Sequence, residues 1–111
     1  MTDIVNADKL YLKVKPLIPI NFRYVNSVYL VGSFANPNKE IDRDGKISDI
    51  DIFMNIDNDA DSISCIKGKY GRVNIDTNTG LFEDRPIQFL TSRQPNVSID
   101  SFDYSIELYN R

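Results

Sequence analysis

Two aspartates, Asp49 and Asp51, lie in the stretch SDIDIF and are the residues of this chain best placed for metal chemistry. Apolar residues alternate with them, a pattern typical of a strand, on which positions 49 and 51 share a face with Cα atoms about 6.5 Å apart. Two carboxylates at that distance repel each other, and a divalent cation between them removes the repulsion. Such oxygen ligands favour Mg²⁺ or Mn²⁺, which in turn bind phosphate oxygens.

A second feature suited to phosphate binding is the pair Gly32-Ser33, which directly follows the apolar run Val28 to Val31. The run predicts a buried strand that ends in a tight turn. Glycine lets the backbone approach a phosphate closely, and exposed N–H groups with the Ser33 hydroxyl can hold its oxygens. Together with the aspartate pair, this turn predicts a nucleotide site at the ends of two strands.

A calcium loop is the competing interpretation of the acidic stretch EIDRDGKISDID, residues 40–51. Counted from Glu40, oxygen-bearing side chains fall at several ligand positions of a twelve-residue EF-hand loop, and Gly45 falls at the sixth position, where glycine is required. The flanks oppose this interpretation, because helix breakers precede the loop and a strand pattern follows it, whereas an EF-hand loop lies between two helices. A polar turn over residues 42–45 is the simpler alternative.

The composition excludes several kinds of active site. The 111 residues include no histidine and one cysteine, Cys65, which excludes a Ser-His-Asp triad, a Cys-His pair, a His-ligated zinc and an internal disulfide. The net charge of −3 opposes a broad nucleic-acid-binding surface, although it leaves a nucleic-acid acceptor open. No apolar run is long enough to span a bilayer and no signal-peptide pattern occurs, so we expect a cytoplasmic protein without membrane association.

The elements that must position these residues are expected to form a single α+β domain over residues 1–111. Before Pro16, Leu10, Leu12 and Val14 alternate as in a strand, while Leu10, Val14 and Leu17 fit a helical stripe, and a short helix is the preferred interpretation. Three segments have strand patterns, residues 28–31, 48–56 and 85–92. A hairpin is expected around the turn at 78–80, and residues 101–109 fit a strand or a helix equally well. The expected fold is therefore a small mixed β-sheet with flanking helices.

The order of these motifs resembles a known signature. The stretches VYLVGSFA and SDIDIFM resemble the signature of the DNA polymerase β-like nucleotidyltransferase superfamily, in which a hydrophobic strand ends in Gly-Ser and the next strand alternates aspartate with hydrophobic residues. Fifteen residues separate Ser33 from Asp49, a slightly longer loop than is usual there. The later stretches TNTGLFEDRPIQFLTS and FDYSIELYN are similar to a pattern in some viral and phage-type members, so the resemblance covers residues 26–109.

The resemblance implies a nucleotidyltransferase-like fold and a nucleotidyl-transfer reaction. Asp49 and Asp51 would hold two Mg²⁺ (or Mn²⁺) ions that bind a nucleoside triphosphate and orient an acceptor hydroxyl for in-line attack on the α-phosphorus. Pyrophosphate would leave, and Gly32 and Ser33 would contact the β- and γ-phosphates. On the strand of the aspartates, Phe53 is either a core aromatic or a ring on which a base could stack.

A third carboxylate that helps to position the nucleophile belongs to the family pattern, and here the sequence departs from it. The strand on which this acid is expected, RPIQFLT, has Gln88 and no acid. Asp103 in SFDYS is the preferred substitute, and Asp76 in VNIDT is the second choice. Without a third acid, we expect weakened activity or a domain that only binds nucleotides.

Two functional hypotheses of different class follow. The first is a metal-dependent nucleotidyltransferase that modifies a small molecule, a nucleic-acid end or a protein hydroxyl. The second is a catalytically weak or inactive protein of the same fold that acts through a protein partner, as an antitoxin- or phage-type protein. A partner subunit or a homodimer could supply the helical wall that shapes the acceptor pocket in active members, because 111 residues leave little room for one.

Overall fold

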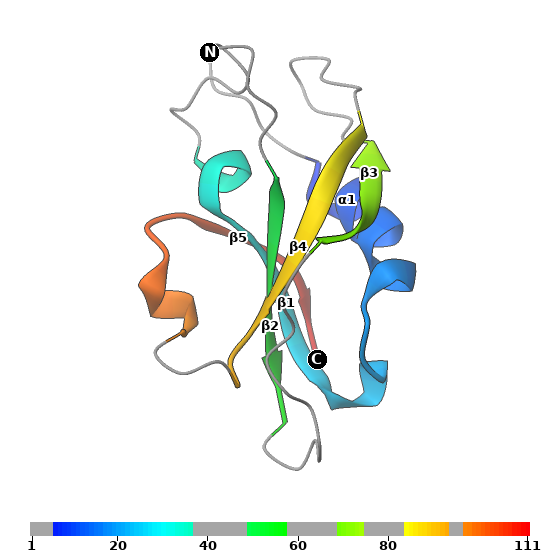
Figure 1. Ribbon diagram of the computed structural model, residues 1–111. Coiled ribbons are helices and arrows are strands. Elements are labelled where there is room, and N and C mark those ends of the chain that lie inside the picture. Colours follow the sequence, from blue (N-terminus) through cyan, green and yellow to red (C-terminus); the bar gives the residue numbers. More distant parts are fainter. Residues whose placement is uncertain (1–5, 37–48, 58–68, 75–83, 94–96) are drawn as a thin grey trace.

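The computed structural model describes residues 6–36, 49–57, 69–74, 84–93 and 97–111. Within these ranges the chain forms one α-helix, five strands and four short 3₁₀ helices (Figure 1). The α-helix and the strands are α1 (Ala7–Val14), β1 (Val25–Val31), β2 (Ile50–Ile56), β3 (Lys69–Asn74), β4 (Asp84–Thr91) and β5 (Ser105–Asn110). The 3₁₀ helices are η1 (Lys15–Leu17), η2 (Phe22–Tyr24), η3 (Gly32–Ala35) and η4 (Ile99–Ser101).

The five described strands join one sheet in the order β3-β4-β2-β1-β5. β1 runs antiparallel to both of its neighbours, β2 and β5, and β3 runs antiparallel to β4. β2 and β4 are parallel, so the sheet is mixed. The expected α+β class with a small mixed sheet is therefore confirmed, with one α-helix rather than several among the described residues.

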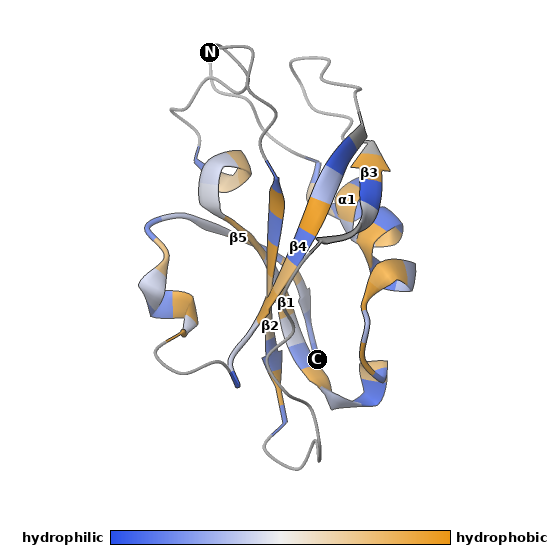
Figure 2. Cartoon of the chain, in the orientation of Figure 1, coloured by the Kyte–Doolittle hydropathy of each residue, from blue (hydrophilic) through white to orange (hydrophobic). Residues whose placement is uncertain are grey.

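The hydrophobic core lies between α1 and one face of the sheet. Leu10 and Val14, one helical turn apart on α1, are buried in it. Period-two alternation along the central strands turns their apolar side chains to the same face, and Figure 2 shows hydrophobic positions alternating with polar ones along the strands. The fully buried strand residues include Leu30, Ile52, Met54, Ile87 and Phe89. Each such side chain contributes about 1.5–3 kcal/mol to folding, so this face holds the sheet and the helix together.

The sequence around α1 sets both of its ends. The Asn6 side chain accepts a hydrogen bond from the backbone N–H of Lys9 (3.1 Å) and so caps the N-terminus. Pro16 lies in η1, which follows directly, and the expected short helix before Pro16 is therefore confirmed. No helix within the described ranges is long and apolar enough to cross a membrane.

The face of the sheet opposite α1 carries Asp51, Phe53 and Asn55 of β2. Phe53 is fully buried there because the ring of Phe102 packs over it, with ring centroids 5.6 Å apart. Phe53 is therefore a buried aromatic on the face away from the main core, and the alternative that a base stacks on it is wrong. Asn55 donates a hydrogen bond to the Ser27 hydroxyl of β1 (2.8 Å), so polar and aromatic side chains share this face.

Three further expectations concern the C-terminal segment, the hairpin and the calcium loop. Residues 101–109, whose pattern fits a strand or a helix, form the end of η4 and then β5. β3 pairs with β4, while the turn expected at 78–80 lies outside the described residues. Residues 40–45 of the calcium interpretation also lie outside them. β2, which follows, is a strand and not the second helix of an EF-hand, which opposes a calcium loop.

Candidate functional site

The turn after β1 and the start of β2 lie side by side. The register of the two strands pairs Val31 with Asp51, so Gly32 comes directly beside the Asp51 side chain. Gly32 has a φ of +78°, and a Cβ atom at this position would lie 2.8 Å from Oδ2 of Asp51. The carboxylate therefore packs against bare backbone, which only glycine permits. The Gly-Ser turn and the acidic strand that the sequence singles out are thus in contact.

The surroundings of Asp51 disfavour the ionised form of its carboxyl group. Its side chain is half-buried, and its pKa is raised from the ordinary 3.8 to about 6, chiefly by this burial and in part by the nearby Asp49 carboxylate. Both effects oppose ionisation of Asp51, and a bound divalent cation would counteract both. Two crowded carboxylates are also the oxygen donors that Mg²⁺ and Mn²⁺ prefer. The residues present therefore fit the cation that the sequence predicts here.

No third carboxylate joins this pair in the described part of the chain. The direct parallel partner of Asp51 on β4 is Gln88, which is an amide. Among the described residues, no three side chains of His, Cys, Asp or Glu are close enough to hold a metal ion together. Asp103 lines a pocket next to Gly32, and Asp76 lies outside the described residues. Water or phosphate oxygens would complete the coordination of an ion held by the aspartate pair.

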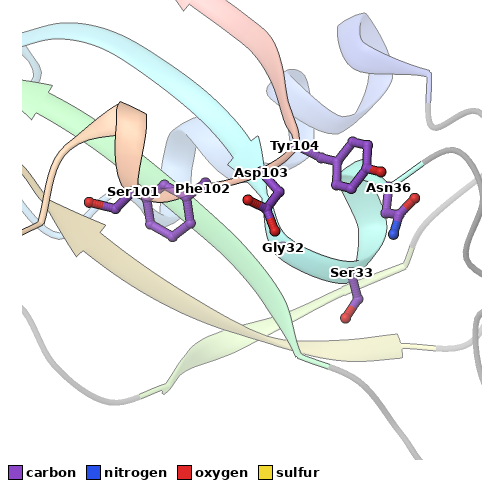
Figure 3. A pocket seen from close by; sticks show the side chains of 7 residues that line it. All are labelled: Gly32, Ser33, Asn36, Ser101, Phe102, Asp103 and Tyr104. Carbon is purple, nitrogen blue, oxygen red and sulfur yellow. The ribbon is translucent and has the colours of Figure 1, made fainter.

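A pocket of about 320 Å³ opens beside the Gly-Ser turn (Figure 3). One wall comes from η3 and the residue after it, and the other comes from the segment that joins η4 to β5. The lining residues are Gly32, Ser33, Asn36, Ser101, Phe102, Asp103 and Tyr104. The two walls meet because Val31, just before the first, pairs with Ser105, just after the second. The volume lies at the small end of the range for small-molecule sites, about 300–1,000 Å³.

The structure gathers part of the predicted site in this pocket. Gly32, Ser33 and Asp103 line it, and Figure 3 shows the Asp103 carboxylate beside Gly32. Asp49 and Asp51 are not lining residues, and Asp51 adjoins the pocket through its contact with Gly32. Sequence patterns did not indicate the other lining residues. The stretch SFDYS also contains Ser101, Phe102 and Tyr104, but only its acid, Asp103, is a predicted site residue.

Phe102 anchors the second wall of the pocket by packing over Phe53. Removal of its ring would uncover Phe53, so Phe102→Ala is expected to lower the free energy of unfolding by about 2 kcal/mol, and Phe102→Leu by less than about 1 kcal/mol. Urea unfolding curves of the two variants measure both changes. A loss below about 0.5 kcal/mol in Phe102→Ala would show that other contacts hold this wall.

Comparison of the chain with protein-family models, with curated proteins and with solved structures found no match. The chemistry of the site is therefore inferred from its own residues. These are a crowded carboxylate pair, a glycine turn packed against one of the two carboxylates, and a polar pocket with a tyrosine in its second wall.

Proposed function

We propose that this protein binds a nucleoside triphosphate together with Mg²⁺ or Mn²⁺ and transfers the nucleoside monophosphate to an acceptor hydroxyl. The observation that carries the proposal is the contact between the Gly32 backbone and the Asp51 carboxylate, which joins a turn suited to phosphate to a pair suited to a cation. The motifs around these residues, which resemble those of the DNA polymerase β-like nucleotidyltransferases, support the same reaction class.

Each residue of the site has a role in this reaction. Asp49 and Asp51 hold the cation, which when bound offsets the charge of the triphosphate and lowers the pKa of the attacking hydroxyl. The backbone of Gly32 and the hydroxyl of Ser33 contact the β- and γ-phosphates. The acceptor oxygen forms a bond to the α-phosphorus, the bond from that phosphorus to the bridging oxygen breaks, and pyrophosphate leaves. Asp103, in the other wall, is the candidate for accepting the hydroxyl proton.

A second candidate is a protein of this fold with little or no catalysis that acts through a protein partner. The pairing of Gln88 with Asp51 favours it, because an amide cannot supply a third negative charge beside the pair. A homodimer or a separate subunit could also complete the acceptor side of an active site. The net charge of −3 gives no support to a nucleic acid as the acceptor.

Titration calorimetry with ATP, GTP, CTP and UTP, each in Mg²⁺ and in EDTA, tests the main proposal. Wild type is expected to bind at least one of these nucleotides, and only in Mg²⁺. Asp49→Asn/Asp51→Asn is expected to weaken this binding at least about 100-fold, because the cation loses both of its charged ligands.

The matched control is Asp8→Asn/Asp57→Asn, which removes the same charge elsewhere. Asp8 lies on α1, on the other side of the sheet, and Asp57 follows the far end of β2, where it forms an exposed ion pair with Arg111 (3.7 Å). The control is expected to bind as wild type does. Equal weakening in both double variants, or metal-dependent binding that survives in Asp49→Asn/Asp51→Asn, would contradict the proposed site. Binding without turnover of any acceptor would favour the second candidate.

A further inference from the structure

Two aromatic side chains line the pocket, and one of them has an open face. The ring of Phe102 is half-buried and packs on Phe53. Tyr104 is 40% exposed, and no aromatic ring of the described residues stacks on it. Within the described ranges, Leu12 on α1 is the only other large hydrophobic side chain with comparable exposure. The Tyr104 ring is therefore accessible from the pocket, where a ligand could contact it.

Tyr104 lies close to the turn suited to phosphate. It precedes Ser105, whose partner Val31 precedes Gly32, so the strand register brings the tyrosine across the pocket from the turn. Figure 3 shows the Tyr104 ring at the end of the pocket where Asn36 lies, with Asp103 between Tyr104 and Phe102. A ligand whose phosphates contact the turn would extend its other end along this ring.

The chemistry of this end of the pocket suits the planar base of a nucleotide. Base–aromatic stacking strengthens binding by about 5- to 100-fold per base, and it does so for every base because each has a π-face. Asn36, at the same end, has a side-chain amide, a group that can donate to and accept from the edge of a base. A pocket of about 320 Å³ suits one nucleoside rather than a run of stacked bases, and the net charge of −3 agrees with this.

We propose that the Tyr104 ring stacks on the nucleobase of the bound nucleoside triphosphate. This inference rests on the proposed function and assigns the nucleoside end of the same site. Stacking on Tyr104 would let the site bind nucleotides with any of the four bases, since stacking and one amide do not select among them.

Tripolyphosphate has the three phosphates and no ring, so it separates stacking from phosphate binding. In Mg²⁺, Tyr104→Ala is expected to weaken the best-bound nucleotide by about 5- to 100-fold and to leave tripolyphosphate affinity unchanged within about twofold. Tyr104→Phe keeps the ring and is expected to bind the nucleotide as wild type does. Tyr24→Ala removes a tyrosine from η2, at the opposite end of β1, and serves as the control for loss of a ring.

The possible results separate this inference from the proposed function. Unchanged nucleotide affinity in Tyr104→Ala overturns the stacking role, and so does an equal loss for nucleotide and tripolyphosphate. The same holds if wild type binds tripolyphosphate as tightly as any nucleotide, although the proposed cation and phosphate site then stands. If Tyr104→Ala lowers turnover but not nucleotide affinity, the ring contacts the acceptor and the inference is wrong. If wild type binds neither probe in Mg²⁺, the proposed function fails as well.

Discussion

Gly32→Ala is expected to lower the free energy of unfolding by about 2–4 kcal/mol and to abolish metal-dependent nucleotide binding. A positive φ costs an L side chain about 1–2 kcal/mol, and here φ is +78°. The new Cβ would also lie 2.8 Å from Oδ2 of Asp51, so the carboxylate or the turn must move. Either movement separates the carboxylate pair from the turn that would contact the phosphates. Urea unfolding measures the first effect, and calorimetry in Mg²⁺ measures the second.

Gly71 provides a matched control for this substitution. It also has a positive φ, +73°, but among the described residues a Cβ there would meet only the Leu17 side chain, at an ordinary contact distance of 3.7 Å. Gly71→Ala should therefore show the backbone cost alone, about 1–2 kcal/mol, with nucleotide binding unchanged. In an Asp51→Ala background, Gly32→Ala should cost no more than Gly71→Ala, because the clashing atom is gone. If the two glycine substitutions lower the free energy of unfolding of wild type equally, the contact with Asp51 adds nothing to the cost of Gly32→Ala.

Asp51→Asn is expected to make the metal-free protein more stable at pH 7.5, by on the order of 1–2 kcal/mol. The folded-state pKa of Asp51, about 6, lies above the ordinary 3.8, so between these values the folded protein keeps a proton that the unfolded chain releases. The contribution of this carboxyl to stability is therefore fully present below pH 3.8, falls as the pH rises through 6 and stays low above it. The side chain is partly exposed, and water reduces the effect below the full value of the shift.

Urea unfolding of wild type and Asp51→Asn in EDTA, at pH 4 and pH 7.5, measures this contribution. The stability difference between the two proteins should be larger at pH 7.5, because at pH 4 the folded wild type is also neutral at Asp51. Asp57→Asn, which changes a partly exposed aspartate after the other end of β2, should stay within about 0.5 kcal/mol of wild type. Mg²⁺ should then stabilise wild type and not Asp51→Asn. A difference that does not depend on pH would exclude the carboxylate as its source.

The parts of the fold with local signals were predictable from the sequence. On β2, apolar residues such as Ile50 and Ile52 alternate with polar ones, and this alternation alone indicates a strand with Asp51 on the face away from the core. The signal for α1 is weaker, because the spacing of Leu10 and Val14 before Pro16 favours a helix while the alternation through Leu12 also fits a strand. The motif order also suggested that Gly32 lies near Asp51, although it could not give the contact between them.

The pocket was not predictable, because its walls depend on pairing between distant strands. Along β5, exposed and half-buried residues alternate with little contrast in burial, so periodicity cannot separate a strand from a helix there. The burial of Phe53 depends on Phe102, which is far away in the sequence. The position of Gln88 beside Asp51 depends on a parallel pairing that no local pattern specifies. The burial and the neighbours of these residues are therefore set by contacts between segments that are distant in the sequence.

The position of β5 at the edge of the sheet, paired only with β1, bears on the order in which the site assembles. Pairing of segments so far apart in the chain requires closure of a long loop, whose entropy cost delays such contacts relative to the β3–β4 pairing. The Gly32–Asp51 contact needs only β1 and β2, whereas Asp103 and Tyr104 reach the pocket only when β5 docks. The proposed cation site and the proposed nucleoside site would thus form at different stages of folding. A molecule in which β5 separates from β1 would keep the proposed cation site and lose the proposed nucleoside site.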